Sequence, residues 1–254
     1  MKKSYFLIVL FCGLLLAAPL EAQRRKKQPE PKAPAFDAAE YGRISLRNLS
    51  PGHTGGRITD IAVNPENRSI RYVATASGNV WKTVNAGTTW EPIFDDYGSF
   101  SIGTITLDPH NPNVIWLGTG ENNSQRSVGY GDGVYKSTDA GKSWQHMGLK
   151  TSEHIGKIVV DPRDTDVVYV ASQGPLWSAG GERGLYKTTD GGKNWNRVLH
   201  VSENTGISDL AMHPDNPDVL YAASYQRRRH FGILIAGGPE GAVYKSTDGG
   251  ANWK

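Results

Sequence analysis

One short motif occurs four times in this chain, and its repetition limits the fold more than any other feature of the sequence. Each copy reads Ser/Thr-x-Asp/Asn-x-Gly-x-Thr/Ser/Asn-Trp. The copies occupy residues 83–90, 137–144, 188–195 and 246–253, so their closing tryptophans are 54, 51 and 58 residues apart. Such a period indicates a tandem array of similar structural units.

Short apolar and β-branched runs between the motifs predict four β-strands in each unit. The first strand of each unit ends in an Asn/Asp/His-Pro turn, at Pro65, Pro109, Pro162 and Pro214. No segment shows a long 3.6-residue apolar period, so helix is expected to be nearly absent. The pattern predicts an all-β chain, a β-propeller with four four-stranded blades. The expected blades span about residues 56–100, 101–153, 154–205 and 206–254.

The motif itself is expected to hold a turn rather than to perform chemistry. Asp or Asn at its third position can accept hydrogen bonds from backbone N–H groups of the turn. Gly at the fifth position tolerates positive φ, and the closing Trp buries a large ring. Because the pattern recurs in every unit, we assign it a structural role, with calcium binding as the alternative. The residues concerned are Asn85, Gly87, Trp90, Asp139, Gly141, Trp144, Asp190, Gly192, Trp195, Asp248, Gly250 and Trp253.

The first 41 residues predict export followed by a linker. Lys2 and Lys3 precede an apolar run at 5–16, and small residues follow it, which is typical of a signal peptide over residues 1–22. A retained membrane anchor is the alternative, whereas a lipid anchor on Cys12 is disfavoured because Cys12 lies within the run. Residues 23–41 are expected to be a basic, Pro-rich linker, or an attachment to an anionic cell-surface polymer. We expect a secreted, periplasmic or cell-surface protein without a membrane span once the leader is removed.

Composition argues against several classes of partner and cofactor. The net charge is +3, but residues 1–36 hold seven Lys/Arg and two Asp/Glu, which leaves 21 basic and 23 acidic residues in 37–254. A nucleic-acid partner is therefore not expected. The seven His residues are scattered without ligand spacing, so no metal and no cofactor are expected either.

Length variation is concentrated in the connection between the second and third strands of each unit. The landmark aromatic residues on these two strands are 9, 19, 17 and 23 residues apart in the four units. Long loops on a rigid scaffold often carry binding, and the loops of units two to four should converge on one side. The candidate ligand-binding residues are Glu121, Asn122, Arg126, Trp177, Arg183, Arg227, Arg228 and Arg229. Structural alternatives are local turn bonding at residues 121–122, a solvated charge run at 227–229 and loop capping by Trp177.

The motif resembles the Asp-box, or bacterial neuraminidase, repeat over residues 42–254. The segments Gly55–Ile58, Gly78–Thr83 and Gly118–Asn122 further resemble large secreted bacterial proteins described as sortilin N-terminal-type or glycosyl-hydrolase-like repeat proteins. Asp-box repeats also occur in sialidases, xyloglucanases and a photosystem II assembly propeller, so the resemblance implies a scaffold and not one reaction. At the position where xyloglucanase-type propellers place a catalytic Asp, this chain has Ala76, and it lacks the Arg-Ile-Pro of sialidases.

These observations favour an exported repeat propeller that binds an extracellular or periplasmic protein, peptide or glycan. The alternatives are part of a glycoside hydrolase whose essential carboxylates lie outside this chain, and a cell-envelope assembly or scaffold factor. An enzyme is not favoured, because glycoside hydrolysis needs two carboxylates facing one bond and no convincing pair can be nominated.

The chain is further expected to be an open, truncated propeller. The fourth motif is followed by a single residue, Lys254, and residues 42–48 resemble a lone strand ahead of the first unit. Closed propellers use about 4–8 blades. We therefore expect one partner to be the remainder of the chain's own propeller beyond residue 254.

Overall fold

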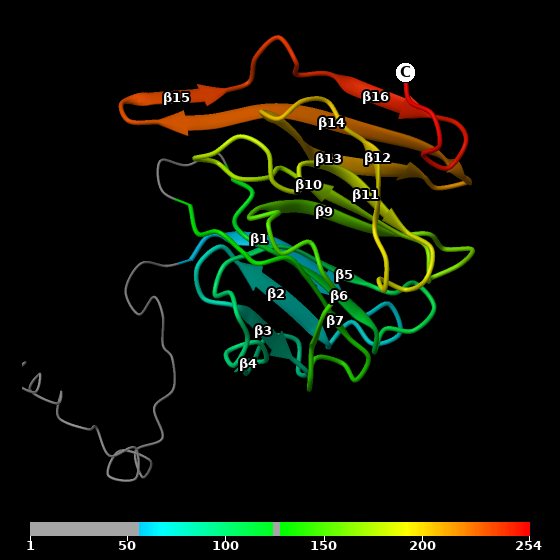
Figure 1. Cartoon of the computed structure of the whole chain (residues 1–254). Helices are drawn as coiled ribbons and strands as arrows, with labels where there is room; N and C mark the ends of the chain where they lie inside the picture. Colours follow the sequence, from blue (N-terminus) through cyan, green and yellow to red (C-terminus); the bar gives the residue numbers. More distant parts are fainter. Residues whose placement is uncertain (1–55, 124–127) are drawn as a thin grey trace, which may run out of the picture. The chain divides into compact units, whose positions relative to one another are not determined.

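The computed structural model describes residues 56–123 and 128–254. This part of the chain contains 16 strands and no helix, and the strands form four four-stranded antiparallel sheets (Figure 1). The prediction of an all-β chain with four four-stranded units is confirmed. The expected leader and linker, the strand expected at 42–48, and Arg126 lie outside the described residues.

Blades 1 to 3 are meanders in which each strand pairs with the next strand along the chain. Blade 1 contains β1 (Ile58–Val63), β2 (Arg71–Thr75), β3 (Val80–Thr83) and β4 (Glu91–Pro92). Blade 2 contains β5 (Ile102–Leu107), β6 (Ile115–Thr119), β7 (Val134–Ser137) and β8 (Gln145–His146). Blade 3 contains β9 (Ile155–Val160), β10 (Val168–Ser172), β11 (Gly184–Thr188) and β12 (Asn196–Leu199).

Blade 4 departs from this plan through one long strand. It contains β13 (Thr205–His213), β14 (Asn216–His230), β15 (Ile233–Ala236) and β16 (Val243–Ser246). The first part of β14 pairs with β13 and β16, and its last four residues pair with β15 to form a hairpin (Figure 1). The expectation that Arg227, Arg228 and Arg229 lie in a loop is therefore wrong. They are strand residues, because β15 supplies their backbone partners.

The hydrophobic core is divided among the three interfaces between consecutive blades. Each interface packs apolar residues from the first strand of one blade against the second and third strands of the preceding blade. At the first interface, Ile102 and Ile105 of blade 2 share a buried cluster with Tyr72 and Val80 of blade 1. The two following interfaces repeat this arrangement with equivalent residues. The repeated sequence therefore encodes both the blade and the surface on which the next blade packs.

A lysine on the third strand also links each blade to the next one. The Nζ atoms of Lys82, Lys136 and Lys187 donate to carbonyl oxygens in the following Asp-box, those of Ala140 (2.9 Å), Gly191 (3.4 Å) and Gly249 (2.8 Å). Each ammonium also lies 4.6–5.6 Å from the centre of the landmark aromatic ring on the second strand of its own blade. Cation–π attraction therefore orients each lysine toward its carbonyl partner.

The first residue of the motif organises the turn together with the third. In blade 2, Ser137 is 1% exposed, and its Oγ accepts hydrogen bonds from the N–H groups of Asp139 (3.3 Å) and Gly141 (2.8 Å). The same Oγ donates to Oδ1 of Asp139; this Oδ1 also accepts from the N–H of Ser143, and Oδ2 of Asp139 accepts from the Ser143 hydroxyl. The fifth-position glycines have φ between +85° and +97°. The sequence analysis assigned the hydrogen bonding of the turn to the third motif position alone and did not identify the buried hydroxyl at the first position.

This geometry predicts that the Ser137 hydroxyl contributes more to stability than the negative charge of Asp139. Ser137→Ala is expected to lower the free energy of unfolding by about 1–3 kcal/mol, because the buried N–H of Gly141 loses its acceptor. Asp139→Asn is expected to cost less, since Asn85 makes the equivalent contacts in blade 1. Urea unfolding of the two variants measures which of them loses more free energy of unfolding. A larger loss for Asp139→Asn than for Ser137→Ala would contradict it.

Candidate functional site

Residues that follow the second strands of blades 2 and 3 meet the end of β14 in blade 4. Gln173 donates from Nε2 to the carbonyl oxygen of Asn122 (3.2 Å). Arg227 donates to Oε1 of Gln173 (3.0 Å) and to the carbonyl oxygens of Asn122 (3.4 Å) and Asn123 (2.5 Å). We call Glu121, Asn122, Gln173 and Arg227 the polar layer. It brings three blades together at one end of their second strands.

Blade 1 reaches the polar layer through an ion pair that sequence analysis did not predict. Arg57 donates from Nε and Nη2 to the two carboxylate oxygens of Glu121, at 2.6 and 2.7 Å. Glu121 is fully buried, whereas the Arg57 side chain is 44% exposed. The hydrogen bond to Glu121 raises the pKa of Arg57. Glu121 is thus engaged by a bidentate partner and is not available to a ligand, which corrects its nomination as a ligand-binding residue.

Arg183 holds the loop after β10. Its guanidinium is buried (1% exposed) and donates to the carbonyl oxygens of Gln173, Pro175 and Ser178. Burial lowers the pKa of Arg183 to about 10. The carbonyl oxygens of the loop therefore surround a buried cation and accept its hydrogen bonds. Arg183 was nominated as a ligand-binding residue, and its burial corrects this to a positioning role.

Two of the three consecutive arginines on β14 are buried as well. Arg227 is 2% exposed and Arg228 is 7% exposed. Arg228 donates to the side-chain oxygen of Asn204. Neither is a solvated surface charge, which corrects that interpretation for these two residues. A guanidinium can be buried here because nearby loops present oxygen acceptors to it.

Trp177 is the exposed aromatic residue on the loop that Arg183 holds. Its side chain is 60% exposed, and the Arg229 guanidinium lies 5.4 Å from the centre of its ring. The backbone N–H of Arg229 donates to the carbonyl oxygen of Leu176 (2.9 Å). The hairpin of blade 4 therefore supports the Trp177 loop of blade 3. A large apolar ring is held at the surface beside positive charge.

Buried polar atoms without a hydrogen-bond partner are concentrated around this loop. Among the described residues they include Nε of Arg183, Arg227 and Arg228, Nη1 of Arg229, Nδ1 of His154 and Oε1 of Gln226. Arginine nitrogens can only donate. Because each of these atoms is buried, none of them is presented to a ligand at the surface.

Carboxylates in the connections between second and third strands have local partners. Tyr135 donates a hydrogen bond to Asp132 (2.6 Å), Thr151 donates one to Glu182 (3.0 Å), and Ser202 donates one to Glu240 (2.6 Å).

The carboxylates of the Asp-box turns are strongly ionised. Hydrogen bonds from Asn194 lower the pKa of Asp190 to about 2, and those from Ser143 lower the pKa of Asp139 to about 2. Such strongly ionised groups are poor general acids.

Two further residues bear on catalysis. Ala76, at the position where the resemblance to xyloglucanase-type propellers implies a catalytic Asp, is fully buried. Glu153, which sequence analysis did not nominate, has φ of +53°, and burial raises its pKa. A carboxyl with a raised pKa can act as a proton donor, but hydrolysis of a glycosidic bond needs a second carboxylate opposite it.

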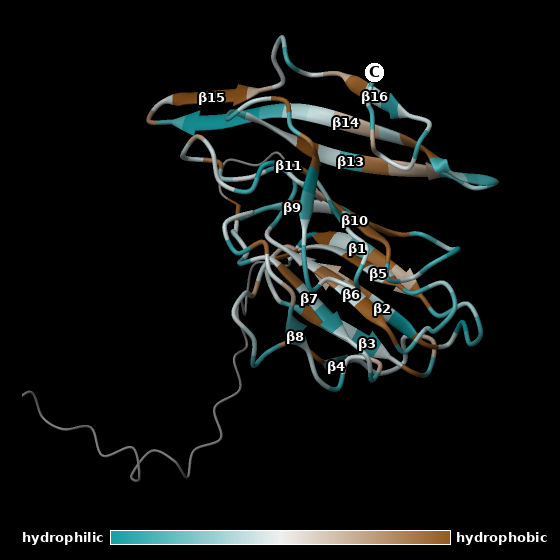
Figure 2. Cartoon of the chain, turned by 45° about the vertical axis from the view of Figure 1, so that its right-hand side comes forward, coloured by the Kyte–Doolittle hydropathy of each residue, from teal (hydrophilic) through white to brown (hydrophobic). Residues whose placement is uncertain are grey.

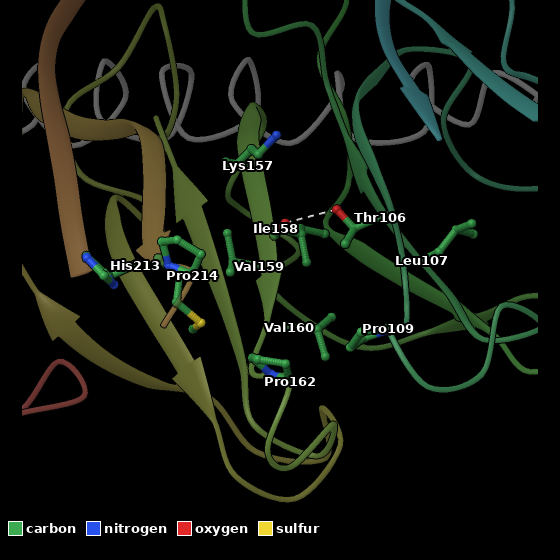
Figure 3. A pocket seen from close by; sticks show the side chains of 11 residues that line it. Thr106, Leu107, Pro109, Lys157, Ile158, Val159, Val160, Pro162, His213 and Pro214 are labelled. Atoms are coloured by element: carbon green, nitrogen blue, oxygen red, sulfur yellow. Dashed lines mark hydrogen bonds between the residues drawn. The ribbon is translucent and has the colours of Figure 1, made fainter. Parts of the chain in front are cut away.

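A separate groove lies along the first strands of blades 2 to 4, toward their proline turns (Figure 3). It encloses about 330 Å³ and is lined by 11 residues, among them Lys157, Ile158, Pro109, Pro162 and Pro214. The hydroxyl of Thr106 donates across it to the carbonyl oxygen of Ile158 (2.9 Å). Its lining is largely hydrocarbon and contains no carboxylate, so it offers few groups that could orient a polar ligand.

Within residues 56–123 and 128–254, no three His, Cys, Asp or Glu side chains are grouped so that they could hold a metal ion. The same part of the chain contains no helix long and apolar enough to span a membrane.

Comparisons with known proteins place this geometry among Asp-box propellers. The family model described as "Sortilin, neurotensin receptor 3" (Sortilin-Vps10) matches residues 132–254. A xyloglucanase of Paenibacillus sp is 25% identical over 238 residues, covering 85% of this chain and 22% of that protein. Xyloglucanase Xgh74A of Acetivibrio thermocellus is 24% identical over 230 residues, covering 82% of this chain and 26% of that protein. The chain therefore spans about a quarter of the length of these curated relatives.

Solved structures give the same result for the fold. An ancestral GH74 enzyme superposes with a TM-score of 0.61 at 24% identity, covering 78% of this chain and 25% of that one. The GH74 enzyme of Niastella koreensis gives a TM-score of 0.57 at 24% identity, covering 76% and 28%. The chain is thus an open four-blade β-propeller related to sortilin and glycosyl-hydrolase repeats.

Proposed function

We propose that this chain is a glycan-binding propeller module whose ligand is a polysaccharide of the xyloglucan type. The observation that carries the proposal is the exposed ring of Trp177, held by Arg183 from within its loop and by Arg229 from the neighbouring blade. An aromatic ring fixed at the surface offers an apolar plane against which the C–H face of a sugar can stack. A ring already held in place loses little conformational freedom on binding.

The donors around Trp177 fit the same class of ligand. Sugar hydroxyl and ring oxygens accept hydrogen bonds, and the half-buried Arg229, whose guanidinium lies 5.4 Å from the centre of the Trp177 ring, can donate them, directly or through water. The proteins named xyloglucanases among the relatives suggest which polysaccharide to test first. Export, as expected from residues 1–22, would bring the chain to such polymers outside the cell.

Binding without hydrolysis is the better supported form of this proposal. Ala76 replaces the carboxylate that the xyloglucanase resemblance implies, and Glu121 is occupied by Arg57. The second candidate is a part of a glycoside hydrolase, for which Glu153 is the carboxyl best suited to donate a proton. That candidate requires the opposing carboxylate to come from outside this chain.

Binding to xyloglucan is expected to depend on Trp177. Trp177→Ala should raise the Kd by about tenfold or more, the effect expected for a central aromatic contact. Trp90→Ala is the matched control, because Trp90 is 40% exposed but belongs to an Asp-box turn at the opposite end of the strands. Isothermal titration calorimetry measures both, with thermal melts to show that each variant is folded.

The same experiment separates the candidates. Equal affinity of Trp177→Ala and the parent chain, or binding of an unrelated galactomannan as tightly as xyloglucan, would overturn the proposed site. New reducing ends released from xyloglucan by the purified chain would favour the hydrolase over the binding module.

A further inference from the structure

Glu153 lies between blades 2 and 3 and contacts a long connection of each. Its carbonyl oxygen accepts a hydrogen bond from the N–H of Gly131 (2.7 Å), in the connection between β6 and β7. Its carboxylate accepts one from the N–H of Leu176, the residue before Trp177, and is attracted by the positive charge of Arg183. The backbone of Glu153 therefore holds the connection of blade 2, and its side chain holds the Trp177 loop of blade 3.

The backbone of Glu153 has a conformation that favours glycine. Its φ is +53°, in the left-handed region that a residue with a Cβ atom rarely adopts. Its carbonyl group packs closely on blade 2, since a Cβ atom on Gly120 would collide with that group. Glycine would fit position 153 without strain, so the backbone alone does not explain the glutamate. Strained residues of this kind are concentrated at functional sites.

Leu176, which receives the Glu153 carboxylate, is held on every side. Its carbonyl oxygen accepts a hydrogen bond from the N–H of Arg229 in β14 (2.9 Å), and its side chain is only 2% exposed. Figure 2 shows this end of β14 as hydrophilic and the adjacent β15 as hydrophobic, so the loop meets the polar strand of the hairpin. A residue whose N–H, carbonyl and side chain are all engaged fixes the backbone from which the next side chain, that of Trp177, projects.

Charged and polar groups of one loop converge on the Glu153 carboxylate. Burial raises the pKa of Glu153, whereas the N–H of Leu176 and the positive charge of Arg183 oppose this rise. The Arg183 guanidinium in turn donates to the carbonyl oxygens of Pro175 and Ser178, on both sides of Trp177 in the sequence. The carboxylate thus satisfies the backbone donor before Trp177, and the guanidinium satisfies backbone acceptors around it.

We infer that Glu153 is a positioning residue of the glycan-binding loop, whose carboxylate fixes Leu176 so that the Trp177 ring is held ready for a sugar to stack on it. The inference rests on the proposed function of Trp177. Glu153 acts through the loop backbone and not by contact with the sugar. Without the carboxylate, the ring must be ordered when the sugar binds, and that conformational cost lowers the affinity.

Substitutions at position 153 separate the side chain from the backbone. Glu153→Gly removes the carboxylate but suits the left-handed backbone, so this variant should unfold at the urea concentration of the parent or at a higher one. Its Kd for a xyloglucan oligosaccharide should nevertheless rise about fivefold. Glu153→Gln retains an oxygen acceptor for the N–H of Leu176 and should bind like the parent. The control is Ala140→Gly, which relieves a φ of +60° in the Asp-box turn of blade 2 and should leave the Kd unchanged.

Fluorine NMR of the chain labelled with fluorotryptophan follows the ring without a ligand. The Trp177 resonance is the one that disappears in Trp177→Phe. Glu153→Gly should shift or broaden this resonance and leave the other tryptophan resonances in place, and Glu153→Gln should keep it at the parent's position. An unchanged Trp177 resonance in Glu153→Gly would overturn the inference. So would a Glu153→Gly variant that unfolds earlier with all tryptophan resonances disturbed, because Glu153 would then have only a general structural role.

The two measurements keep this inference apart from the proposed function. A parent chain that does not bind xyloglucan would overturn the proposed function, while the Trp177 resonance would still report whether Glu153 positions the ring. Binding that depends on Trp177 but is unchanged in Glu153→Gly would support the proposed function and overturn the inference.

Discussion

Replacing Arg183 by Met is expected to lower the free energy of unfolding by about 3 kcal/mol or more. The side chain is buried and donates to three backbone carbonyl oxygens of the loop at 173–178. Hydrogen bonds to a charged group contribute about 1.5–3 kcal/mol each, and buried acceptors left without a donor add a desolvation cost. Met keeps much of the hydrocarbon volume, so the loss reports on the guanidinium. Urea unfolding at one fixed protein concentration measures it.

The control for this prediction is Arg68→Met, because Arg68 is an exposed arginine in a turn of blade 1 and its replacement should have little effect. Arg183→Met should also weaken xyloglucan binding at temperatures where the variant is folded, since the loop that carries Trp177 loses its internal support. An Arg183→Met variant that unfolds like the parent would show that the loop does not depend on the buried cation.

Strand positions were predictable here because the sequence repeats. The first strands at 58–63, 102–107 and 155–160 each contain apolar residues at matching positions and end at an X-Pro turn. Four aligned copies therefore separate the structural signal from local variation. The same alignment could have revealed the buried first-position hydroxyl, since Thr83, Ser137, Thr188 and Ser246 all provide one.

The candidate site was harder to predict because its contacts connect distant and non-repeated residues. Arg57 and Glu121 are 64 residues apart, and Arg227 and Asn122 are 105 apart. A run of three arginines usually indicates a solvated surface. Only the apolar segment at 233–236, which pairs with residues 227–230, could have indicated a longer strand. Burial of the guanidinium groups depends on loop carbonyls whose positions no local pattern specifies.

His154 occupies a buried position near the polar layer and should make stability depend on pH. It is 2% exposed, and its Nδ1 has no hydrogen-bond partner among the described residues. Burial, together with the positive charges of Arg227 and Arg183, lowers the pKa of His154 to about 3, and a hydrogen bond to the backbone of Glu121 only partly opposes this. The ring is therefore neutral in the folded chain throughout the physiological range.

The unfolded chain binds a proton at this residue below a pH of about 6.5, whereas the folded chain does not until about pH 3. Stability that is present above pH 6.5 is therefore lost as the pH falls from 6.5 toward 3. By pH 4.5 the loss assigned to His154 should reach roughly 3 kcal/mol, at 1.36 kcal/mol for each pH unit.

Urea unfolding at pH 7 and pH 4.5 should show that the loss of stability between these pH values is smaller by this amount in His154→Gln than in the parent. The control is His213→Gln, at an exposed position, which should keep the parent's loss. The Asp-box carboxylates, whose pKa falls from 3.8 in the unfolded chain to about 2 in the folded one, lose their stabilising contribution only below about pH 3.8, so they contribute little between pH 7 and pH 4.5. An unchanged difference between the two pH values in His154→Gln would mean that the ring is protonated, or reaches water, in the folded chain. The polar layer would then tolerate a second positive charge beside Arg227.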